Sequence, residues 1–133
     1  MKLVYKIHKP ISLIIDYLTD MQKFVSVHPV IYKIDKLDKN KYLVYETLKL
    51  GFIPVSFTYP AIIESNFIDT VTIRATVMKL SKIEMVFTLK VKDNFTLVEE
   101  NIRFNSPLPI KSIMESIFRK QHSLLFKNIE LTN

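Results

Sequence analysis

The spacing of apolar residues in the last quarter of the chain predicts one long amphipathic helix. From Pro107 to Leu131, apolar positions recur at intervals of three and four residues, as they do along one face of an α-helix. These positions are Ile110, Ile113, Met114, Ile117, Phe118, Leu124 and Leu125. Ser106 and Pro107 are typical of a helix start, because serine can accept a hydrogen bond from the first turn and proline needs no N–H partner there. A helix of about 22 residues would be roughly 33 Å long, and its charged residues make it too polar to span a bilayer.

Most of the remaining chain alternates apolar and polar residues with the period of two that is typical of half-buried strands. Strands are predicted at residues 1–7, 30–37, 42–50, 52–65, 69–80, 83–92 and 95–104. Helical spacing after the first strand predicts two short helices at about 10–19 and 20–27, the second ended by His28 because the residue before a proline leaves the helical region. The later strands are joined by links of hairpin length, so the sheet is predicted to be antiparallel. Pro60 predicts a bulge or bend in its strand, since it lacks a ladder N–H.

These elements together predict an α+β fold in a single domain, residues 1–133. Seven strands with one apolar face must be covered by another layer. The C-terminal helix is the one predicted element long enough to cover them. The expected architecture is therefore a seven-stranded antiparallel sheet beneath a long C-terminal helix, with two short helices between strands 1 and 2.

Composition excludes several classes of function. Gly51 is the only glycine, which argues against the Gly-rich phosphate cradles of P-loops and dinucleotide-binding folds. The chain has no cysteine, so it has neither a disulfide nor a thiol nucleophile. The net charge is +6, but the basic residues are mostly lysine and are scattered, which argues against specific nucleic-acid recognition. The first residues lack the apolar segment of an export signal, so a cytoplasmic location is expected.

The order of elements and several short phrases resemble the SRPBCC superfamily. The phrases are Leu18-Thr19-Asp20 through Phe24, His28-Pro29 before the second strand, Thr96-Leu97-Val98-Glu99-Glu100 in the last strand and Ser106-Pro107-Leu108-Pro109 before the helix. This superfamily includes the START domains, birch-pollen-allergen-like proteins and polyketide cyclase/dehydrase-like proteins. The resemblance covers essentially the whole chain. It implies a helix-grip fold, in which a curved sheet wraps around the long helix and encloses a cavity for a hydrophobic ligand, with no cofactor.

Strand alternation places two carboxylates on apolar faces. Glu46 shares a face with Val44 and Leu48, and Glu100 shares one with Val98 and Ile102. Burial without a partner would raise the pKa of each carboxyl and suit it to acid or base chemistry. The alternative is that each is paired with a cation or a tyrosine, or lies at the open rim. On the polar face, Arg74 and Glu84 are expected to form a solvated cross-strand pair.

Aromatic residues and methionines provide the candidate lining of a pocket for a drug-sized apolar ligand. The candidates are Tyr45, Phe57, Tyr59, Met85, Phe87, Phe104, Met114 and Phe118, together with Glu46, Glu100 and His122. The alternative is that these side chains simply fill the core. His122 could reach the cavity or lie half in water at its boundary. His28 is either a gate residue or a helix-ending residue with a backbone partner, and no pair of histidines has the spacing of metal ligands.

The leading functional hypothesis is the non-catalytic binding of a small hydrophobic or amphipathic molecule, such as a lipid or polyketide-like compound. An alternative is an enzyme of the cyclase or dehydratase kind, with Glu46 or Glu100 as acid or base and Tyr45, Tyr59 or His28 polarising a carbonyl. That hypothesis requires at least two of these groups to converge on one wall of the pocket. A further alternative is an interaction or chaperone-adaptor module whose basic surface makes transient contact with an anionic partner or membrane. The oligomeric state stays open.

Overall fold

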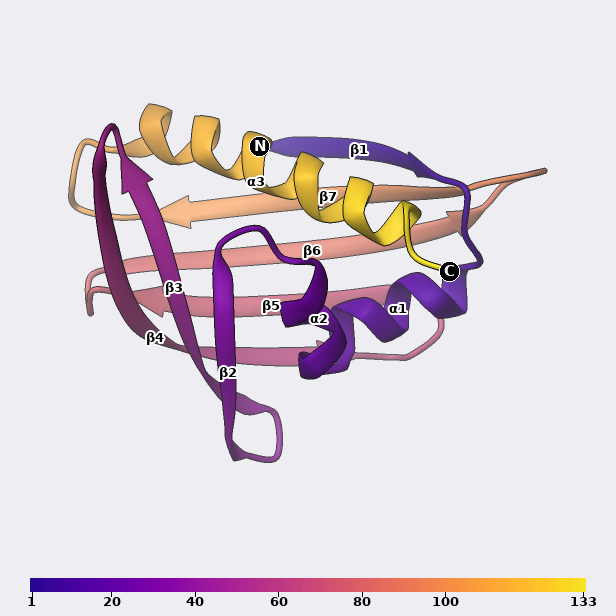
Figure 1. Ribbon diagram of the computed structural model, residues 1–133, viewed down its shortest axis with the longest axis horizontal. Coiled ribbons are helices and arrows are strands. Elements are labelled where there is room, and N and C mark those ends of the chain that lie inside the picture. The colour runs from indigo at the N-terminus through magenta and orange to yellow at the C-terminus, as the bar shows by residue number, and fades with distance from the viewer.

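A computed structural model describes the backbone of residues 1–133 and every side chain except that of Leu50. The chain order is strand, two short helices, six strands and a long helix (Figure 1). The elements are β1 (Lys2–Ile7), α1 (Ile11–Thr19), α2 (Met21–Val27), β2 (Ile31–Asp38), β3 (Lys41–Leu50), β4 (Ile53–Ser65), β5 (Thr70–Val77), β6 (Ser81–Val91), β7 (Thr96–Asn105) and α3 (Lys111–Glu130). The predicted α+β class, strand number and order of elements are confirmed.

The seven strands form one antiparallel sheet in the order β1-β7-β6-β5-β4-β3-β2. Strands β2 to β7 therefore follow one another as a meander, which agrees with the short links between them. The first strand pairs with the last, with Lys2 opposite Asn101 and Ile7 opposite Thr96. The sheet curves around α3, while α1 and α2 lie beside the C-terminal half of that helix (Figure 1). The helices and the sheet thus enclose the apolar interior between them.

Strand β4 bends near Pro60, as the sequence predicts. Its pairing with β3 runs continuously from Leu50 opposite Ile53 to Lys41 opposite Ile62, so the bend is not a bulge in that ladder. Its pairing with β5 begins only at Ala61. The first half of β4 therefore turns away from β5 together with β3, which curls that side of the sheet toward α3 (Figure 1).

The helix α3 starts later than the sequence predicts. It begins at Lys111, and Ser106 to Pro109 form a loop in which Ser106 accepts a hydrogen bond from the Leu108 N–H at 3.2 Å. The prediction that Ser106 and Pro107 start the helix is wrong because Pro109 disfavours helical geometry at Leu108. The buried face of α3 is also rotated from the predicted stripe, since it carries Phe118, Gln121, His122, Leu125, Phe126 and Ile129. Ile113 and Leu124, which were predicted to be on the covered face, are exposed.

The turn between β5 and β6 also differs from the prediction. Strand β5 ends at Val77 rather than Leu80, and Ser81 already belongs to β6. Met78 and Lys79 have φ angles of 56° and 61°. These left-handed conformations suit a tight hairpin turn, but neither residue is the glycine or asparagine by which such a turn is recognised in a sequence.

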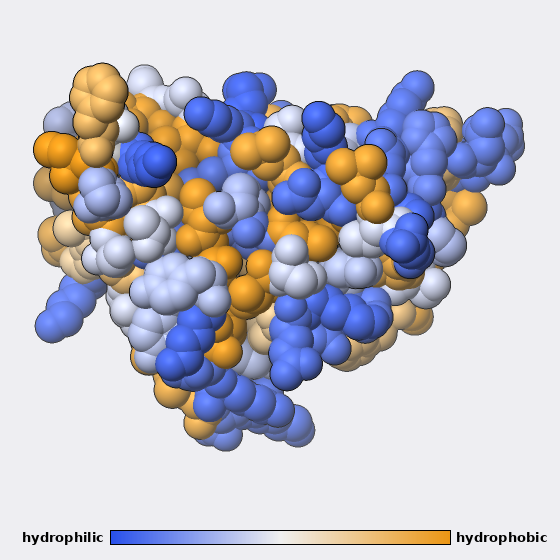
Figure 2. All heavy atoms as spheres, viewed as in Figure 1, coloured by the Kyte–Doolittle hydropathy of each residue, from blue (hydrophilic) through white to orange (hydrophobic). Residues whose placement is uncertain are grey.

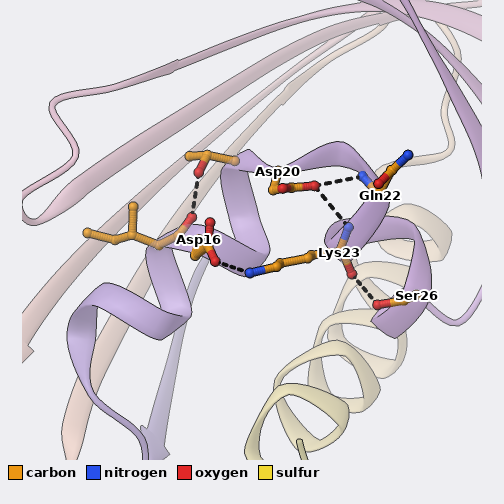
Figure 3. Close-up of polar contacts among 7 residues, drawn as sticks. Asp16, Asp20, Gln22, Lys23 and Ser26 are labelled. Atoms are coloured by element: carbon orange, nitrogen blue, oxygen red, sulfur yellow. Dashed lines mark hydrogen bonds and ion pairs between the residues drawn. The ribbon is translucent and has the colours of Figure 1, made fainter.

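The junction of α1 and α2 is held by a compact set of polar contacts (Figure 3). Asp20 ends α1 and caps α2, because its side chain accepts hydrogen bonds from the N–H groups of Gln22 at 3.1 Å and Lys23 at 3.2 Å. Lys23 also pairs with Asp16 on α1. The cap satisfies two free N–H groups of the first turn of α2. It thereby orients this short helix, which ends at His28 beside the interior.

Candidate functional site

A partly enclosed cavity lies between α3 and the concave face of the sheet. Its volume is about 70 Å³, and side chains from α2, α3 and strands β2 to β6 line it. Most of these side chains are apolar. The polar ones are His28, Glu46, Tyr59, Gln121 and His122. The cavity thus combines an apolar wall with a few polar groups, which is the pattern of small-molecule sites in proteins.

Glu46 and Tyr59 meet on neighbouring strands in the cavity wall. The Tyr59 hydroxyl donates a hydrogen bond to Glu46 Oε1 at 2.7 Å. Burial raises the pKa of the Glu46 carboxyl, and the hydrogen bond from Tyr59 opposes that change. The pKa of the Tyr59 phenol is raised well above its ordinary value, mainly by burial and to a lesser extent by the nearby Glu46. The tyrosine therefore stays protonated as a donor, and the predicted inward orientation of Glu46 is confirmed.

His28 is fixed at the end of α2 by the backbone that follows it. Its Nδ1 accepts hydrogen bonds from the N–H groups of Val30 at 3.2 Å and Ile31 at 3.0 Å. Burial, and to a lesser extent His122, lowers the pKa of His28 to about 3. The imidazole is therefore neutral with its proton on Nε2, an assignment that follows from these hydrogen bonds. The predicted helix-ending role with a backbone partner is confirmed, and the same ring lines the cavity.

Glu100, behind the cavity wall, forms a second buried pair with His122, which lines the cavity. Glu100 is completely buried and His122 is 4% exposed. The His122 Nδ1 and Glu100 Oε2 atoms lie 2.6 Å apart, but the two groups are not aligned for a hydrogen bond. The nearby Tyr5 hydroxyl also lacks a hydrogen-bond partner among the described residues. The pKa of this phenol is raised, mainly by burial and to a lesser extent by the charge of Glu100. The view of His122 as half in water is wrong, because the rotated face of α3 carries it inward.

The structure brings most of the predicted site residues to the cavity. Those that line it are His28, Glu46, Phe57, Tyr59, Met85, Phe87, Met114, Phe118 and His122. Gln121 also lines it, although it was not among the residues predicted from the sequence. Its position three residues after Phe118 and four before Leu125 is the signal that could have identified it.

Three predicted site residues lie elsewhere. Tyr45 points to the outer face, where its hydroxyl donates to Asp35 at 3.0 Å, because strand alternation turns it away from the cavity when Glu46 points inward. Phe104 packs against Phe118 in a separate core cluster, with ring centroids 6.5 Å apart. Glu100 is buried beside His122 but does not line the cavity.

The cavity is smaller than the pocket predicted from the sequence. Sites for drug-sized ligands usually have volumes of roughly 300–1,000 Å³, whereas this one measures about 70 Å³. The expectation of a drug-sized pocket is therefore wrong for this conformation. The physical reason is that the aromatic and methionine side chains that line the space also occupy most of it, as in a packed core.

Solved structures share this architecture over almost the whole chain. A START superfamily protein from Mycobacterium smegmatis has a TM-score of 0.80 and 12% identity, over 98% of this chain and 93% of that one. Ara h 8.0201 has a TM-score of 0.76 and 14% identity, also over 98% of this chain and 93% of that one. The di-domain ARO/CYC BexL from the BE-7585A biosynthetic pathway has a TM-score of 0.80 and 10% identity, over 98% of this chain and 46% of that one.

These similarities establish the fold. The chain has the helix-grip fold of these structures, as its sequence predicts. No protein-family model matches the sequence, and no curated protein is significantly similar to it. Among the described residues, no helix is both long and apolar enough to cross a membrane. No group of three or more His, Asp or Glu side chains in the described part could hold a metal ion.

Proposed function

We propose that this protein binds a small, largely apolar molecule in the cavity beneath α3. The observation that carries the proposal is a partly enclosed, mostly apolar space in which the Glu46 and Tyr59 pair supplies a polar anchor. A packed core without function has no need of a buried carboxylate, since isolated buried polar groups lower stability. The helix-grip fold agrees with this proposal.

Binding requires the lining side chains to move. A volume of about 70 Å³ holds a few water molecules, so a ligand of six or more heavy atoms must displace part of the wall. Met114 lines the cavity near the start of α3, and its unbranched side chain adapts readily to a new shape. We therefore place the ligand, or the apolar end of a larger lipid or polyketide-like one, beneath the first turns of α3.

Exposed apolar residues surround the end of the molecule where such a ligand would enter. Phe52 is fully exposed and Ile53 is 67% exposed at the β3–β4 tip, and Ile113 is 57% exposed on α3. Figure 2 shows apolar residues gathered at this end, in the upper left of the view. Clusters of exposed apolar residues often mark binding sites.

Toluene is a suitable probe of the proposal because it is apolar and has seven heavy atoms. We expect it to shift the methyl NMR signals of Ile73, Ile117 and Leu125, which line the cavity, with a Kd of about 1 mM or lower. Replacing Ala75 with leucine adds three carbons to the wall and should weaken binding at least about tenfold.

The control is Thr76→Leu, which puts the same leucine side chain at the next position of β5, where strand alternation turns the side chain to the opposite face. This variant should bind toluene as the unmodified protein does. Equal binding by Ala75→Leu, or shifts confined to surface methyl groups, would contradict a site beneath α3.

A second candidate function is acid–base catalysis of the cyclase or dehydratase kind. The convergence that this hypothesis requires is met, because Glu46 and Tyr59 share a hydrogen bond and His28 lines the same cavity. A carboxyl whose pKa is raised by burial is suited to take and return a proton near neutral pH. In a dehydration, Glu46 would remove the proton α to a carbonyl and return it to the β-hydroxyl, which leaves as water.

The probe for catalysis is 4-hydroxy-2-butanone, a small β-hydroxy ketone whose dehydration gives an enone that absorbs in the ultraviolet. If the protein is such a catalyst, the purified protein should accelerate enone formation over buffer. Glu46→Gln should lower the rate about 10²-fold or more, since general acid–base catalysis contributes 10²–10⁴-fold. Tyr59→Phe, which keeps the ring and removes the donor, should have a smaller effect. Equal rates for the unmodified protein and Glu46→Gln would exclude Glu46 as the acid–base group.

A further inference from the structure

The cavity wall differs in charge from the rest of the protein. The chain has 19 Lys and Arg residues and a net charge of +6. Among the described residues that line the cavity there is no lysine or arginine. The acidic side chain in the wall is Glu46, and a second carboxylate, Glu100, lies 2.6 Å from His122 just behind it. An anionic group of a ligand in this cavity would therefore lie near the Glu46 carboxylate, with no lysine or arginine in the wall to balance its charge.

The polar groups of the wall also have defined hydrogen-bonding directions. The Tyr59 hydroxyl is engaged as a donor to Glu46, which leaves carboxylate oxygen lone pairs as acceptors. His28 uses Nδ1 as an acceptor from Val30 and Ile31, so its other ring nitrogen carries the proton and is a donor. Ile31 pairs with Glu46 across β2 and β3, which places His28 and Glu46 on adjoining parts of the wall. The wall thus provides an acceptor at Glu46 and a donor at His28.

We infer that the cavity selects a neutral apolar molecule that carries a hydroxyl group, an alcohol or a phenol, and rejects carboxylates and phosphates. This inference rests on the proposed binding function. A hydroxyl matches the wall because it can both donate, as Glu46 requires, and accept, as His28 requires. An anionic group would be buried beside Glu46 without a cation. A protonated amine would find one carboxylate but would leave its remaining N–H groups without acceptors.

A matched series of aromatic probes tests the inference at pH 7.5. Benzyl alcohol, benzylamine and benzoate share a ring with toluene and differ in the polar group, which is neutral, cationic and anionic in turn. Methyl NMR titration should give benzyl alcohol the lowest Kd of the series. The Kd of benzoate should be at least tenfold higher than that of benzyl alcohol, and benzylamine should fall between them.

The substitution Glu46→Gln isolates the role of the carboxylate charge. Glutamine keeps the shape of the side chain and can still accept the Tyr59 hydrogen bond, so the fold should be retained, as a thermal unfolding curve can verify. We expect the tenfold preference for benzyl alcohol over benzoate to fall to threefold or less. The control is Glu64→Gln, which removes a carboxylate that pairs with Arg74 outside the cavity and should leave the preference unchanged.

The outcomes separate the inference from the proposed function. If toluene binds but benzoate binds as well as benzyl alcohol, the selection by hydroxyl is wrong and the binding function stands. The same holds if benzylamine binds most tightly. If none of the four probes shifts the cavity methyl signals at millimolar concentration, both proposals are overturned. A preference that survives in Glu46→Gln also overturns the inference, because its cause is then not the charge of Glu46.

Discussion

Replacement of Phe126 with alanine is expected to lower the free energy of unfolding by about 3–5 kcal/mol, the range for loss of a fully buried aromatic ring. Phe126 is 1% exposed on the buried face of α3. Its ring stacks on Tyr5 of β1 at a centroid distance of 4.5 Å and lies 5.9 Å from the ring of Phe87 on β6. The substitution leaves a cavity at the point where α3 packs against β1 and β6. Urea unfolding followed by circular dichroism at 25 °C measures the change.

Phe52→Ala is the control, since Phe52 is fully exposed at the β3–β4 tip. Removal of the same side chain there should change the free energy of unfolding by no more than about 0.5 kcal/mol. Losses of similar size in the two variants would show that Phe126 is not a core residue. A loss below about 1 kcal/mol for Phe126→Ala would contradict the packing of α3 against the sheet.

Acidification is expected to destabilise the protein through His28. The folded protein keeps this imidazole neutral, with its pKa lowered to about 3 from the ordinary value of 6.5. Between these two pH values the unfolded chain binds more protons at this site than the folded one, so stability falls as the pH is lowered. From pH 7 to pH 4 the loss from His28 should be about 3 kcal/mol. Urea unfolding at each pH gives the free energies to compare.

His28→Asn isolates this contribution, because the asparagine oxygen can accept the same backbone hydrogen bonds but does not titrate. Glu46 acts in the opposite direction, since its raised pKa favours proton uptake by the folded state as the pH falls. Both proteins carry Glu46, so the difference between them reports on His28. The variant should lose about 3 kcal/mol less than the unmodified protein between pH 7 and pH 4. Equal losses would show that His28 already takes up a proton in the folded state.

Local patterns in the sequence account for the elements and their order. Period-two alternation identified every strand, and the change of spacing after residue 7 identified α1 and α2. The cross-strand pair of Arg74 and Glu84 was predicted from alternation and is confirmed, with Arg74 Nε 3.1 Å from Glu84 Oε2. These predictions succeed because the twofold period of a strand and the 3.6-residue period of a helix are properties of the local backbone.

The exact ends and faces of the elements were harder to predict. The start of α3 was predicted at Ser106 and Pro107, but the helix begins at Lys111, after Pro109. The β5–β6 turn uses Met78 and Lys79 in conformations that these residue types seldom adopt. At this turn the tertiary structure overrides a weak local preference.

For the candidate site, alternation alone showed which carboxylates point inward. Glu46 and Glu100 are both buried, as predicted. Their partners could not be predicted from the sequence, because Tyr59 lies on another strand and His122 belongs to the C-terminal helix. Contacts between residues distant in sequence depend on strand register and on the rotation of α3, which no local pattern specifies.

The sequence by itself thus determined the helix-grip order of elements, the apolar interior and the inward carboxylates, because each follows from backbone periodicity and from the burial of apolar surface. Only the tertiary structure decided which face of α3 is buried, that Tyr45 points outward, and how little space the lining side chains leave. These features depend on how side chains from separate elements fill one volume, and close packing makes that volume sensitive to the rotation of a single helix. The cavity beneath α3, with Glu46, Tyr59 and His28 in its wall, is the product of that packing.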